Sequence, residues 1–328
     1  MDRKNTDKQI APMISIIMPV FNTGAYLIEA INSVLNQQPV SGCELPSFEL
    51  LIVDDQSIDQ ETIEILDSAS LLDTRIQVFK NQRKKGAAGA RNTGIMNARG
   101  TWIGFLDSDD IWFPNSLGIR WNYISSNANV RWAGAHFRLL KPTVNAAGKL
   151  AFESAESLLA DLEKKHDLPE LVRLQRPTRE FGDSCMIGIM TVLIKRELII
   201  EKNLFNETLK RTEDYHLWFK CSFDNDLWMI KTDVAFYRIH SGSLTHGNQP
   251  KYFYEDTMIE FLLKEPLGNT HKTTLIRRFE FVMQDQCYFY REKKQFSLAL
   301  KTALQWLIKR PFSPAAWKEL VASGLRFG

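Results

Sequence analysis

The sequence predicts an α/β fold built on a mostly parallel β-sheet that is flanked by helices. Three observations support this prediction. Four apolar runs of strand length occur before residue 107, and three segments with apolar residues at helical spacing separate them. The first run, residues 13–20, is a continuous apolar run, as in strands that are buried on both faces. Polar clusters follow the runs directly, where ligands collect in parallel sheets.

The predicted elements follow one another with short connections in the first third of the chain. Strands are expected at residues 13–20, 48–53, 75–79 and 101–106, and helices at 27–35, around 63–66 and at 86–98. Beyond them we expect strands at 130–140, 185–194 and 227–238 and a short helix at 195–202. This alternation is typical of a layered α/β domain.

Regularity weakens in the second half of the chain, which suggests further organisation. Residues 141–183 contain one charged helical segment, 155–165, and several helix breakers, and are interpreted as an insertion or lid. Residues 249–328 are predicted to be helical, with helices at 252–264, 272–291, 296–308 and 314–323. We therefore divide the chain into an α/β domain, 1–248, and a helical C-terminal region, 249–328.

Composition excludes several classes of protein. The 41 basic and 39 acidic residues give a net charge of +2, which offers no global electrostatic argument for nucleic-acid binding. Four scattered cysteines show no zinc-type spacing, so we expect buried thiols in a reducing compartment and no disulfide framework. With no secretion signal and no apolar run of membrane-spanning length, a cytoplasmic protein is expected.

The stretch 101–112 carries the strongest chemical signal. A strand-like run leads directly into three carboxylates, Asp107, Asp109 and Asp110. Carboxylate oxygens are suitable ligands for Mg²⁺ or Mn²⁺, which in turn bind phosphates. The alternative is that Asp109 or Asp110 caps the following helix and the other acids are turn residues.

Polar residues also follow the second and third strands. Asp54 and Asp55 come directly after the second strand, although helix capping around Asp59 would also explain acids there. Residues 81–92 lead from basic to small residues, which allows a backbone to approach a ligand closely at a helix start. The lysines of this loop are best interpreted as solvated, but Arg91 lies inside the helical pattern and is a stronger candidate.

Two further groups lie nearer the C-terminus. Glu213 and Asp214 follow Thr212 at the start of a predicted helix, where capping and the helix dipole alone favour acids. His240 follows a predicted strand and could be a metal ligand or a histidine that is hydrogen-bonded in a turn.

Taken in order, the segments of residues 14–245 resemble the family 2 glycosyltransferases of the GT-A fold. The similar segments are SIIMPVFNTGAYLIEAINSVLNQ, LIVDDQSID, GAAGARNTGIMNARGTWIGFLDSDD, TEDYHLWFK and YRIHSGSLT. Their order and spacing make the resemblance specific. It implies transfer of a sugar from a nucleotide-diphosphate donor, with a UDP-sugar as the expected donor, and with inversion at the anomeric carbon.

On the donor side, the resemblance implies four binding residues. Pro19 and Phe21 correspond to positions at the nucleotide, Asp55 to the residue that reaches the base, and Arg91 to a donor-site residue. Gln56 departs from the glycine that the family often has at that position.

For the metal and the chemistry, the resemblance implies an acidic site. Asp107 and Asp109 correspond to the D-x-D pair, with Asp107 near ribose or metal and Asp109 a direct ligand of Mn²⁺ or Mg²⁺. His240 corresponds to a histidine that in some members approaches the metal. Asp214 corresponds to the general base, and Glu213 lies beside it at the acceptor.

The expected acceptor is a saccharide or a lipid-linked saccharide, as in the assembly of bacterial surface polysaccharides. One alternative is a sugar-phosphate nucleotidyltransferase, but PVFNTGAY lacks the glycine-rich, basic phosphate loop that this reaction predicts after the first strand. Another is a non-catalytic, nucleotide-sugar-binding scaffold, which loss of Asp109 or Asp214 would indicate; both are present.

The C-terminal helices combine apolar and basic residues. Lysines and arginines near Trp306, Phe312 and Trp317 could seat the protein peripherally on the anionic inner face of the plasma membrane. The alternative is a helical cap on the catalytic domain or a homodimer contact.

Overall fold

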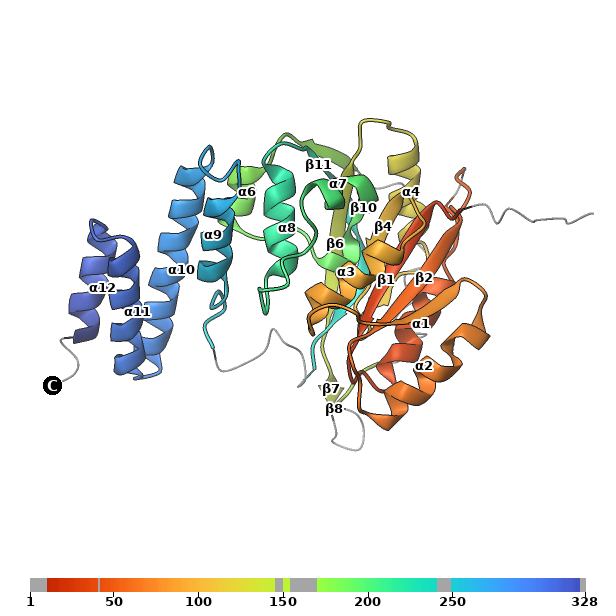
Figure 1. Ribbon diagram of the computed structural model, residues 1–328, viewed down its shortest axis with the longest axis horizontal. Helices are drawn as coiled ribbons and strands as arrows, with labels where there is room; N and C mark the ends of the chain where they lie inside the picture. The colour runs from red at the N-terminus through yellow and green to blue at the C-terminus, as the bar shows by residue number, and fades with distance from the viewer. Residues whose placement is uncertain (1–10, 41, 145–149, 154–169, 241–248, 325–328) are drawn as a thin grey trace, which may run out of the picture. The chain divides into compact units, whose positions relative to one another are not determined.

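The computed structural model describes residues 11–40, 42–144, 150–153, 170–240 and 249–324. The chain forms two compact units, and most of their helices and strands are labelled in Figure 1. Unit 1 comprises Met1–Leu174, Ile187–Leu204 and Asp226–Ile239, and unit 2 comprises Gln175–Met186, Phe205–Asn225 and His240–Gly328.

The described part of unit 1 contains a nine-stranded sheet in the order β3-β2-β1-β4-β10-β6-β11-β5, with β9 also paired to β11. Strands β3, β2, β1 and β4 are mutually parallel, as are β6 and β11. The predicted mostly parallel α/β sheet is therefore confirmed. The strands are β1 (Ile14–Val20), β2 (Phe48–Asp54), β3 (Ile76–Lys80), β4 (Trp102–Phe105), β5 (Ile111–Trp112), β6 (Trp132–Leu140), β9 (Leu171–Leu174), β10 (Leu193–Lys195) and β11 (Leu227–Arg238).

Helices cover both faces of the sheet in unit 1. Every residue of β1 is buried, and successive side chains of a strand point to opposite faces. Ile16 and Met18 share a core cluster with Ile31 of α1, whereas Ile17 lies against Gly94 of α3. The helices of this unit are α1 (Tyr26–Leu35), α2 (Gln60–Leu72), α3 (Ala87–Asn97), α4 (Ser116–Ser125) and α7 (Arg196–Glu201).

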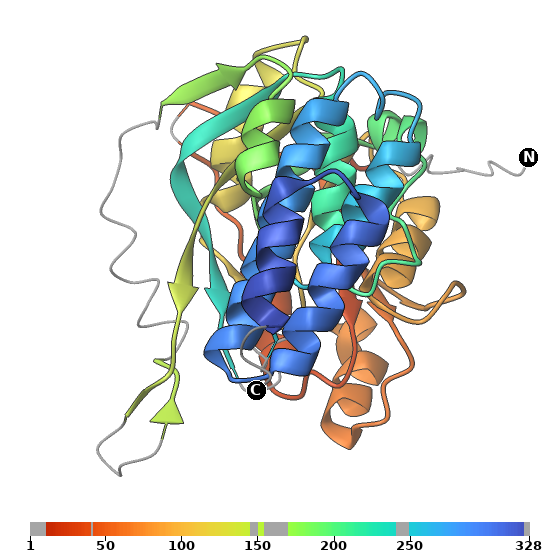
Figure 2. The same cartoon turned by 90° about the vertical axis from the view of Figure 1, so that its left-hand side faces the viewer.

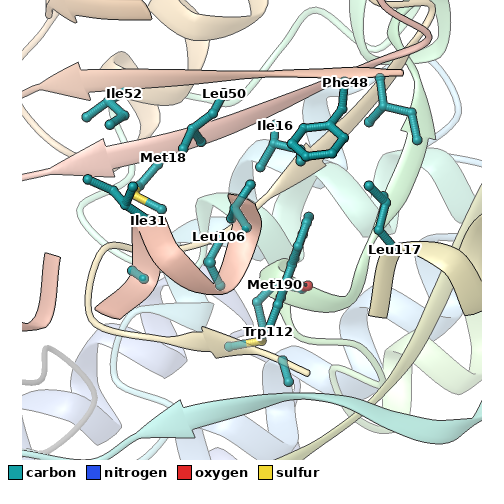
Figure 3. Packing of buried hydrophobic residues seen from close by; sticks show 14 of the residues in the cluster. Ile16, Met18, Ile31, Phe48, Leu50, Ile52, Leu106, Trp112, Leu117 and Met190 are labelled. Carbon is teal, nitrogen blue, oxygen red and sulfur yellow. Dashed lines mark hydrogen bonds between the residues drawn. The ribbon is translucent and has the colours of Figure 1, made fainter. Parts of the chain in front are cut away.

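The core of unit 1 is anchored by Trp112, which is completely buried. Its indole Nε1 donates a 2.7 Å hydrogen bond to the carbonyl oxygen of Met190, so the one polar atom of the ring has a partner. Figure 3 shows Trp112, Met190 and Leu106 packed near Ile31 and the side chains of β1 and β2.

The strand predicted at 185–194 is largely wrong. Residues 185–188 form no strand, a 3-10 turn, η1 (Ile189–Thr191), follows them, and only the short β10 begins near the end of the run. The Thr191 amide donates to the carbonyl of Gly188, which closes the turn. An apolar run shows that a segment is buried but does not show whether it pairs with a neighbouring strand.

Other parts of the prediction have mixed outcomes. The expected helix at 155–165 lies outside the described residues. The structure shows a small hairpin, β7 (Thr143–Val144) and β8 (Leu150–Ala151), within the predicted insertion. The four cysteines form no disulfide, as expected, but only Cys221 and Cys287 are buried, whereas Cys185 is exposed.

The described part of unit 2 is helical. Its helices are α6 (Thr178–Asp183), α8 (Glu213–Ser222), α9 (Glu255–Lys264), α10 (Lys272–Glu292), α11 (Phe296–Lys309) and α12 (Pro314–Gly324). The four helices predicted after residue 249 are confirmed, and α10, α11 and α12 pack side by side (Figure 2). No helix among the described residues has both the length and the apolar character required to cross a bilayer.

Candidate functional site

The carboxyl ends of β1, β2 and β4 meet at one edge of the sheet in unit 1. The amide of Asp55 donates to the carbonyl of Val20 at 2.8 Å, which joins the ends of β2 and β1. The hydroxyls of Thr23 and Ser108 are hydrogen-bonded at 2.6 Å and join the segments after β1 and β4. Polar residues that are far apart in the sequence therefore converge here, as the parallel topology predicts.

Asp55 is buried and firmly oriented. Its Oδ1 accepts a 2.6 Å hydrogen bond from Asn81 Nδ2, and its Oδ2 accepts a 2.7 Å bond from the Gly86 amide. Gly86 has a φ of 130°, a conformation that favours glycine, and it caps α3. The carboxylate is thus fixed between the ends of β2 and β3 and the start of α3.

Phe21 and Pro19 lie at the end of β1 but in different environments. Pro19 is buried and pairs with Val53 of β2. The Phe21 side chain is 47% exposed, and Lys85 Nζ lies 4.3 Å from its ring centroid in a cation–π contact. Phe21 therefore offers an aromatic surface near Asp55, flanked by a positive charge.

Arg91 connects α3 to the acidic stretch after β4. Its Nη2 donates a 2.7 Å hydrogen bond to Oδ1 of Asp107, and the arginine side chain is only 4% exposed against 27% for the aspartate. A buried guanidinium that binds a more exposed carboxylate fixes that carboxylate at the edge of the site.

The acidic stretch itself is held by Arg238, at the end of β11. The Arg238 amide donates to Asp110 Oδ1 at 2.9 Å, and its Nε donates to the backbone carbonyl of Asp109 at 2.9 Å. Its Nη2 donates to Glu29 Oε2 at 2.7 Å, and its guanidinium carbon lies 4.2 Å from the centroid of the Tyr26 ring. Arg238 is 2% exposed, so this network is a rigid support.

The carboxylates differ in environment. Asp110 is completely buried, and this burial, together with the charges of Asp109 and Asp107, raises the pKa of its carboxyl well above the usual range. Asp109 and Asp107 are partly exposed.

Neither Asp109 nor Asp110 caps a helix, because β5 follows at once and Asn115 precedes α4. The capping alternative for these acids is therefore wrong.

By contrast, capping does occur after β2. Asp59 Oδ2 accepts a 3.0 Å bond from the Thr62 amide and caps α2, while Asp54 Oδ1 accepts from the Ser57 amide at 2.9 Å. These local roles explain Asp54 and Asp59, and they leave Asp55 as the acid of this loop that faces the other strand ends.

The donor atoms after β4 fit a hard divalent cation that is completed by phosphate oxygens. Oδ2 of Asp110 is buried and accepts no hydrogen bond from the described residues, and the neighbouring carboxylates supply oxygen ligands. Within the described residues, no three His, Cys, Asp or Glu side chains form a metal-binding group. Mg²⁺ sites commonly use one or two carboxylates together with substrate phosphates, which matches this arrangement.

Glu213 and Asp214 form the first turn of α8 in unit 2. Thr212 precedes them with a φ of 64° and caps the helix without a side-chain hydrogen bond. Leu217, Trp218 and Cys221 are fully buried on the helix. The helix N-terminus stabilises the negative charge of both acids.

Tyr215 stabilises the start of α8 within unit 2. Its hydroxyl donates to the carbonyl of Phe181 in α6, and burial raises the pKa of the phenol. The Thr178 hydroxyl, also in α6, donates to the carbonyl of Ser222 at the other end of α8. Both ends of α8 are therefore fixed to α6, which defines the backbone that carries Glu213 and Asp214.

Unit 1 thus brings together Asp55, Arg91, Asp107 and Asp109, with Phe21 nearby. Glu213 and Asp214 belong to unit 2, so their convergence with the unit 1 acids stays a prediction. His240 is partly buried directly after Ile239, whose amide donates to the Leu140 carbonyl at 2.9 Å. Its metal role likewise stays a prediction.

Sequence reasoning missed the residues that orient the acids: Asn81, Asp110 as a buried acid, Glu29 and Arg238. The signal for two of them was present, because Glu29 and Arg238 lie in the segments SIIMPVFNTGAYLIEAINSVLNQ and YRIHSGSLT. Their pairing, however, spans 209 positions and required the fold.

Comparisons with known proteins agree with this geometry. The model of glycosyl transferase family 2 matches residues 15–177. The Escherichia coli UDP-Glc:alpha-D-GlcNAc-diphosphoundecaprenol beta-1,3-glucosyltransferase WfgD is 30% identical over 79% of this chain and 90% of its own length. An uncharacterized glycosyltransferase of Rickettsia felis is 32% identical over a matched region that covers 73% of this chain and 35% of that relative.

Solved structures show the same fold. One is the mannosyltransferase PcManGT from Pyrobaculum calidifontis in complex with GDP-Man and Mn²⁺, with a TM-score of 0.57 at 13% sequence identity. The match covers 98% of this chain and 82% of the PcManGT chain. S. aureus TarS 1–349 in complex with UDP-GlcNAc has a TM-score of 0.54 at 18% sequence identity, and the match covers 94% of this chain and 79% of the TarS chain. The fold is therefore that of the GT-A glycosyltransferases, and, given the identity to WfgD over nearly its whole length, the chain belongs to glycosyl transferase family 2 and is a glycosyltransferase.

Proposed function

We propose that the protein transfers a sugar, with inversion, from a nucleoside-diphosphate donor to a hydroxyl of a saccharide or lipid-linked saccharide. The observation that carries this proposal is the acidic stretch after β4, held by Arg91 and Arg238 at the sheet edge where Asp55 is also fixed. Acids that are oriented by buried arginines at the ends of parallel strands suit a nucleotide and a cation.

Asp55 and Phe21 bind the nucleotide in this proposal. An ionised carboxylate such as that of Asp55 only accepts hydrogen bonds. Its partner on the nucleotide would therefore be a donor, such as an N–H of the base. Phe21 presents an exposed ring beside it, and base–aromatic stacking is a common way to bind a nucleobase. Lys85, over the same ring, adds positive charge for the phosphates.

Asp109 would be the direct ligand of a divalent cation, with Asp107 beside it near the ribose or the metal and His240 as a further candidate ligand. When bound, Mn²⁺ or Mg²⁺ supplies Lewis-acid stabilisation of the charge that develops on the departing nucleoside diphosphate. Arg91 holds Asp107 in place, and Arg238 fixes the backbone at Asp109.

Asp214 acts as general base and accepts the proton of the acceptor hydroxyl as that oxygen attacks the anomeric carbon. The bond from the anomeric carbon to the diphosphate oxygen breaks as the new glycosidic bond forms on the opposite face, which inverts the configuration. Glu213 lies beside the base and would position the acceptor. Because the displacement takes one step, no enzyme nucleophile is required.

The relatives support the choice of substrates. The name of WfgD specifies UDP-glucose as donor and a diphosphoundecaprenol-linked sugar as acceptor, and TarS binds UDP-GlcNAc in its complex. We therefore favour a UDP-sugar donor and a lipid-linked acceptor that is reached from the cytoplasmic side of the membrane. This assignment places the protein in the synthesis of a surface polysaccharide.

Two asparagine variants test the division of roles. Asp214→Asn should lose transfer while it binds UDP with Mn²⁺ as the wild type does, because only the proton acceptor is removed. Asp109→Asn should instead lose the Mn²⁺-dependent part of UDP binding, measured by calorimetry with and without the metal. Near-normal turnover in Asp214→Asn would refute the base, and unchanged binding in Asp109→Asn would refute the ligand.

A further inference from the structure

The helical hairpin α11–α12 of unit 2 exposes large apolar side chains. Phe312 is 95% exposed and Ile308 81%, and both lie at or next to the connection between the two helices. Val321, Trp317 and Leu304 are each about half exposed on the helices themselves. A cluster of exposed apolar residues of this size commonly marks an interaction site.

These side chains are not left over from an incomplete core. Ala299, Ala303 and Trp306 of α11 and Ala316 of α12 are completely buried, so each helix already has an inward face. The exposed residues form a second set that lies on another face of each helix. Leu304 and Ile308 are one turn apart on α11, as are Trp317 and Val321 on α12.

Ile308, Phe312 and Trp317 lie at or beside the turn of the hairpin, and Leu304 and Val321 lie one helical turn farther along α11 and α12. Helices α11 and α12 lie side by side in both views (Figures 1 and 2). Trp317 Nε1 donates a 2.9 Å hydrogen bond to the carbonyl of Pro311, which holds the indole against the connection that carries Phe312. We call Leu304, Ile308, Phe312, Trp317 and Val321 the apolar tip.

The charge around the apolar tip is positive. Residues 293–318 contain six lysines and arginines and no aspartate or glutamate. Lys309, at the end of α11, pairs with Asp256 and Glu260 of α9, so its charge is offset there. Lys301, one turn before Leu304, and Lys318, next to Trp317, are both exposed. Two copies of this surface would repel each other, which disfavours a homodimer contact, whereas an anionic surface would be attracted.

We propose that the apolar tip docks on an anionic lipid bilayer and lies in its interface. Phe, Trp and Ile on a surface flanked by exposed lysines, here Lys301 and Lys318, are typical of peripheral elements that insert apolar side chains at the level of the headgroups. The proposal deepens the proposed function, since a lipid-linked acceptor lies at a membrane surface.

Flotation of the full chain with vesicles that contain neither donor nor acceptor tests the proposal independently of transfer. The protein should float with vesicles of phosphatidylcholine mixed with phosphatidylglycerol and stay unbound with phosphatidylcholine alone. The double variant Ile308→Ser with Phe312→Ser should bind the mixed vesicles at least roughly ten-fold more weakly. The double variant Lys301→Glu with Lys318→Glu should also lose binding, and high salt should mimic it.

Leu71→Ser is the matched control, because Leu71 is 86% exposed on α2 of unit 1. This variant should float like the wild type. All variants should keep their transfer rate on a water-soluble acceptor. A variant that loses flotation but keeps this rate would show that membrane docking and sugar transfer are tested independently. The proposal is overturned if the wild type does not float, if the tip variants float equally well, or if the tip variants instead dissociate a dimer.

Discussion

The guanidinium of Arg238 donates from Nε to the backbone carbonyl of Asp109, 129 positions earlier in the chain, at 2.9 Å. The same arginine binds Asp110 through its amide and Glu29 through Nη2. One buried side chain thus joins the end of β11 to helix α1 and to the acidic stretch. The position of the Asp109 carboxylate depends on this support, which matters for its proposed role because metal ligands generally depend on the groups that orient them.

Replacing Arg238 with lysine should therefore weaken metal-dependent donor binding. An ammonium group cannot reach the Asp109 carbonyl and Glu29 with fixed fork geometry, so we expect UDP affinity in the presence of Mn²⁺ to fall about 10-fold or more. Calorimetry with and without Mn²⁺ measures the effect. Arg138→Lys, at an exposed ion pair with Asp233, is the control and should bind normally. A lower melting temperature with unchanged Mn²⁺ dependence would show that Arg238 only supports the fold.

A second prediction concerns Asn81, which holds Asp55. Asn81→Ala removes the 2.6 Å bond to Asp55 Oδ1 and leaves a buried carboxylate oxygen without that donor. Such a loss costs about 1–3 kcal/mol, and we expect most of it in donor KM rather than in kcat. Steady-state kinetics with varied donor separates the two constants. Asn97→Ala removes only a bond within α3 and should leave KM unchanged; an equal rise in both variants would contradict the assignment.

How far the sequence predicted this site depends on the range of the contacts. The strands β1, β2 and β4 were predictable because apolar residues dominate their sequences, and Asp55 and Asp107 follow from their positions at strand ends. The run at 185–194 was not predictable, because burial alone does not decide between a strand and the turn around Gly188. Arg238 lies in a segment that resembles the family, but the segment does not reveal its partners, because they come from α1 and from the stretch after β4.

The close approach of α3 to the loop before it gives a third prediction. A Cβ built on Gly89 would lie 1.9 Å from the backbone carbonyl oxygen of Lys84, so Gly89→Ala must displace either the helix or the loop that also bonds Asp55. We expect a loss of roughly 1–3 kcal/mol in unfolding free energy together with weaker donor binding. Chemical denaturation and calorimetry measure the two effects. Gly324→Ala, where nothing lies within 4 Å, should be neutral or slightly stabilising; equal behaviour of the two variants would rule out the packing argument.

The fourth prediction is a pH dependence of stability that arises in unit 2. His216 is 1% exposed, and neither ring nitrogen has a hydrogen-bond partner among the described residues. Burial, reinforced by the charge of Lys220, lowers the pKa of His216 to about 3. Glu265 Oε1 lies 3.9 Å from Nε2 and 3.8 Å from the Lys220 ammonium, and Phe261 packs edge-on, so the lysine offsets the attraction of the carboxylate.

Because the pKa of His216 is lower in the folded protein than its ordinary value of 6.5, the unfolded chain binds the proton more tightly. The contribution of His216 to stability is therefore fully present above pH 6.5 and is lost as the pH falls from there towards 3, by at most about 1.4 kcal/mol per pH unit. His216→Leu removes the titrating group, so the melting temperature of this variant should fall less than that of the wild type between about pH 7 and about pH 5. Parallel curves for the two proteins would show that His216 does not control the acid sensitivity, whereas a flatter curve for the variant identifies the cost of charging this buried imidazole as its cause.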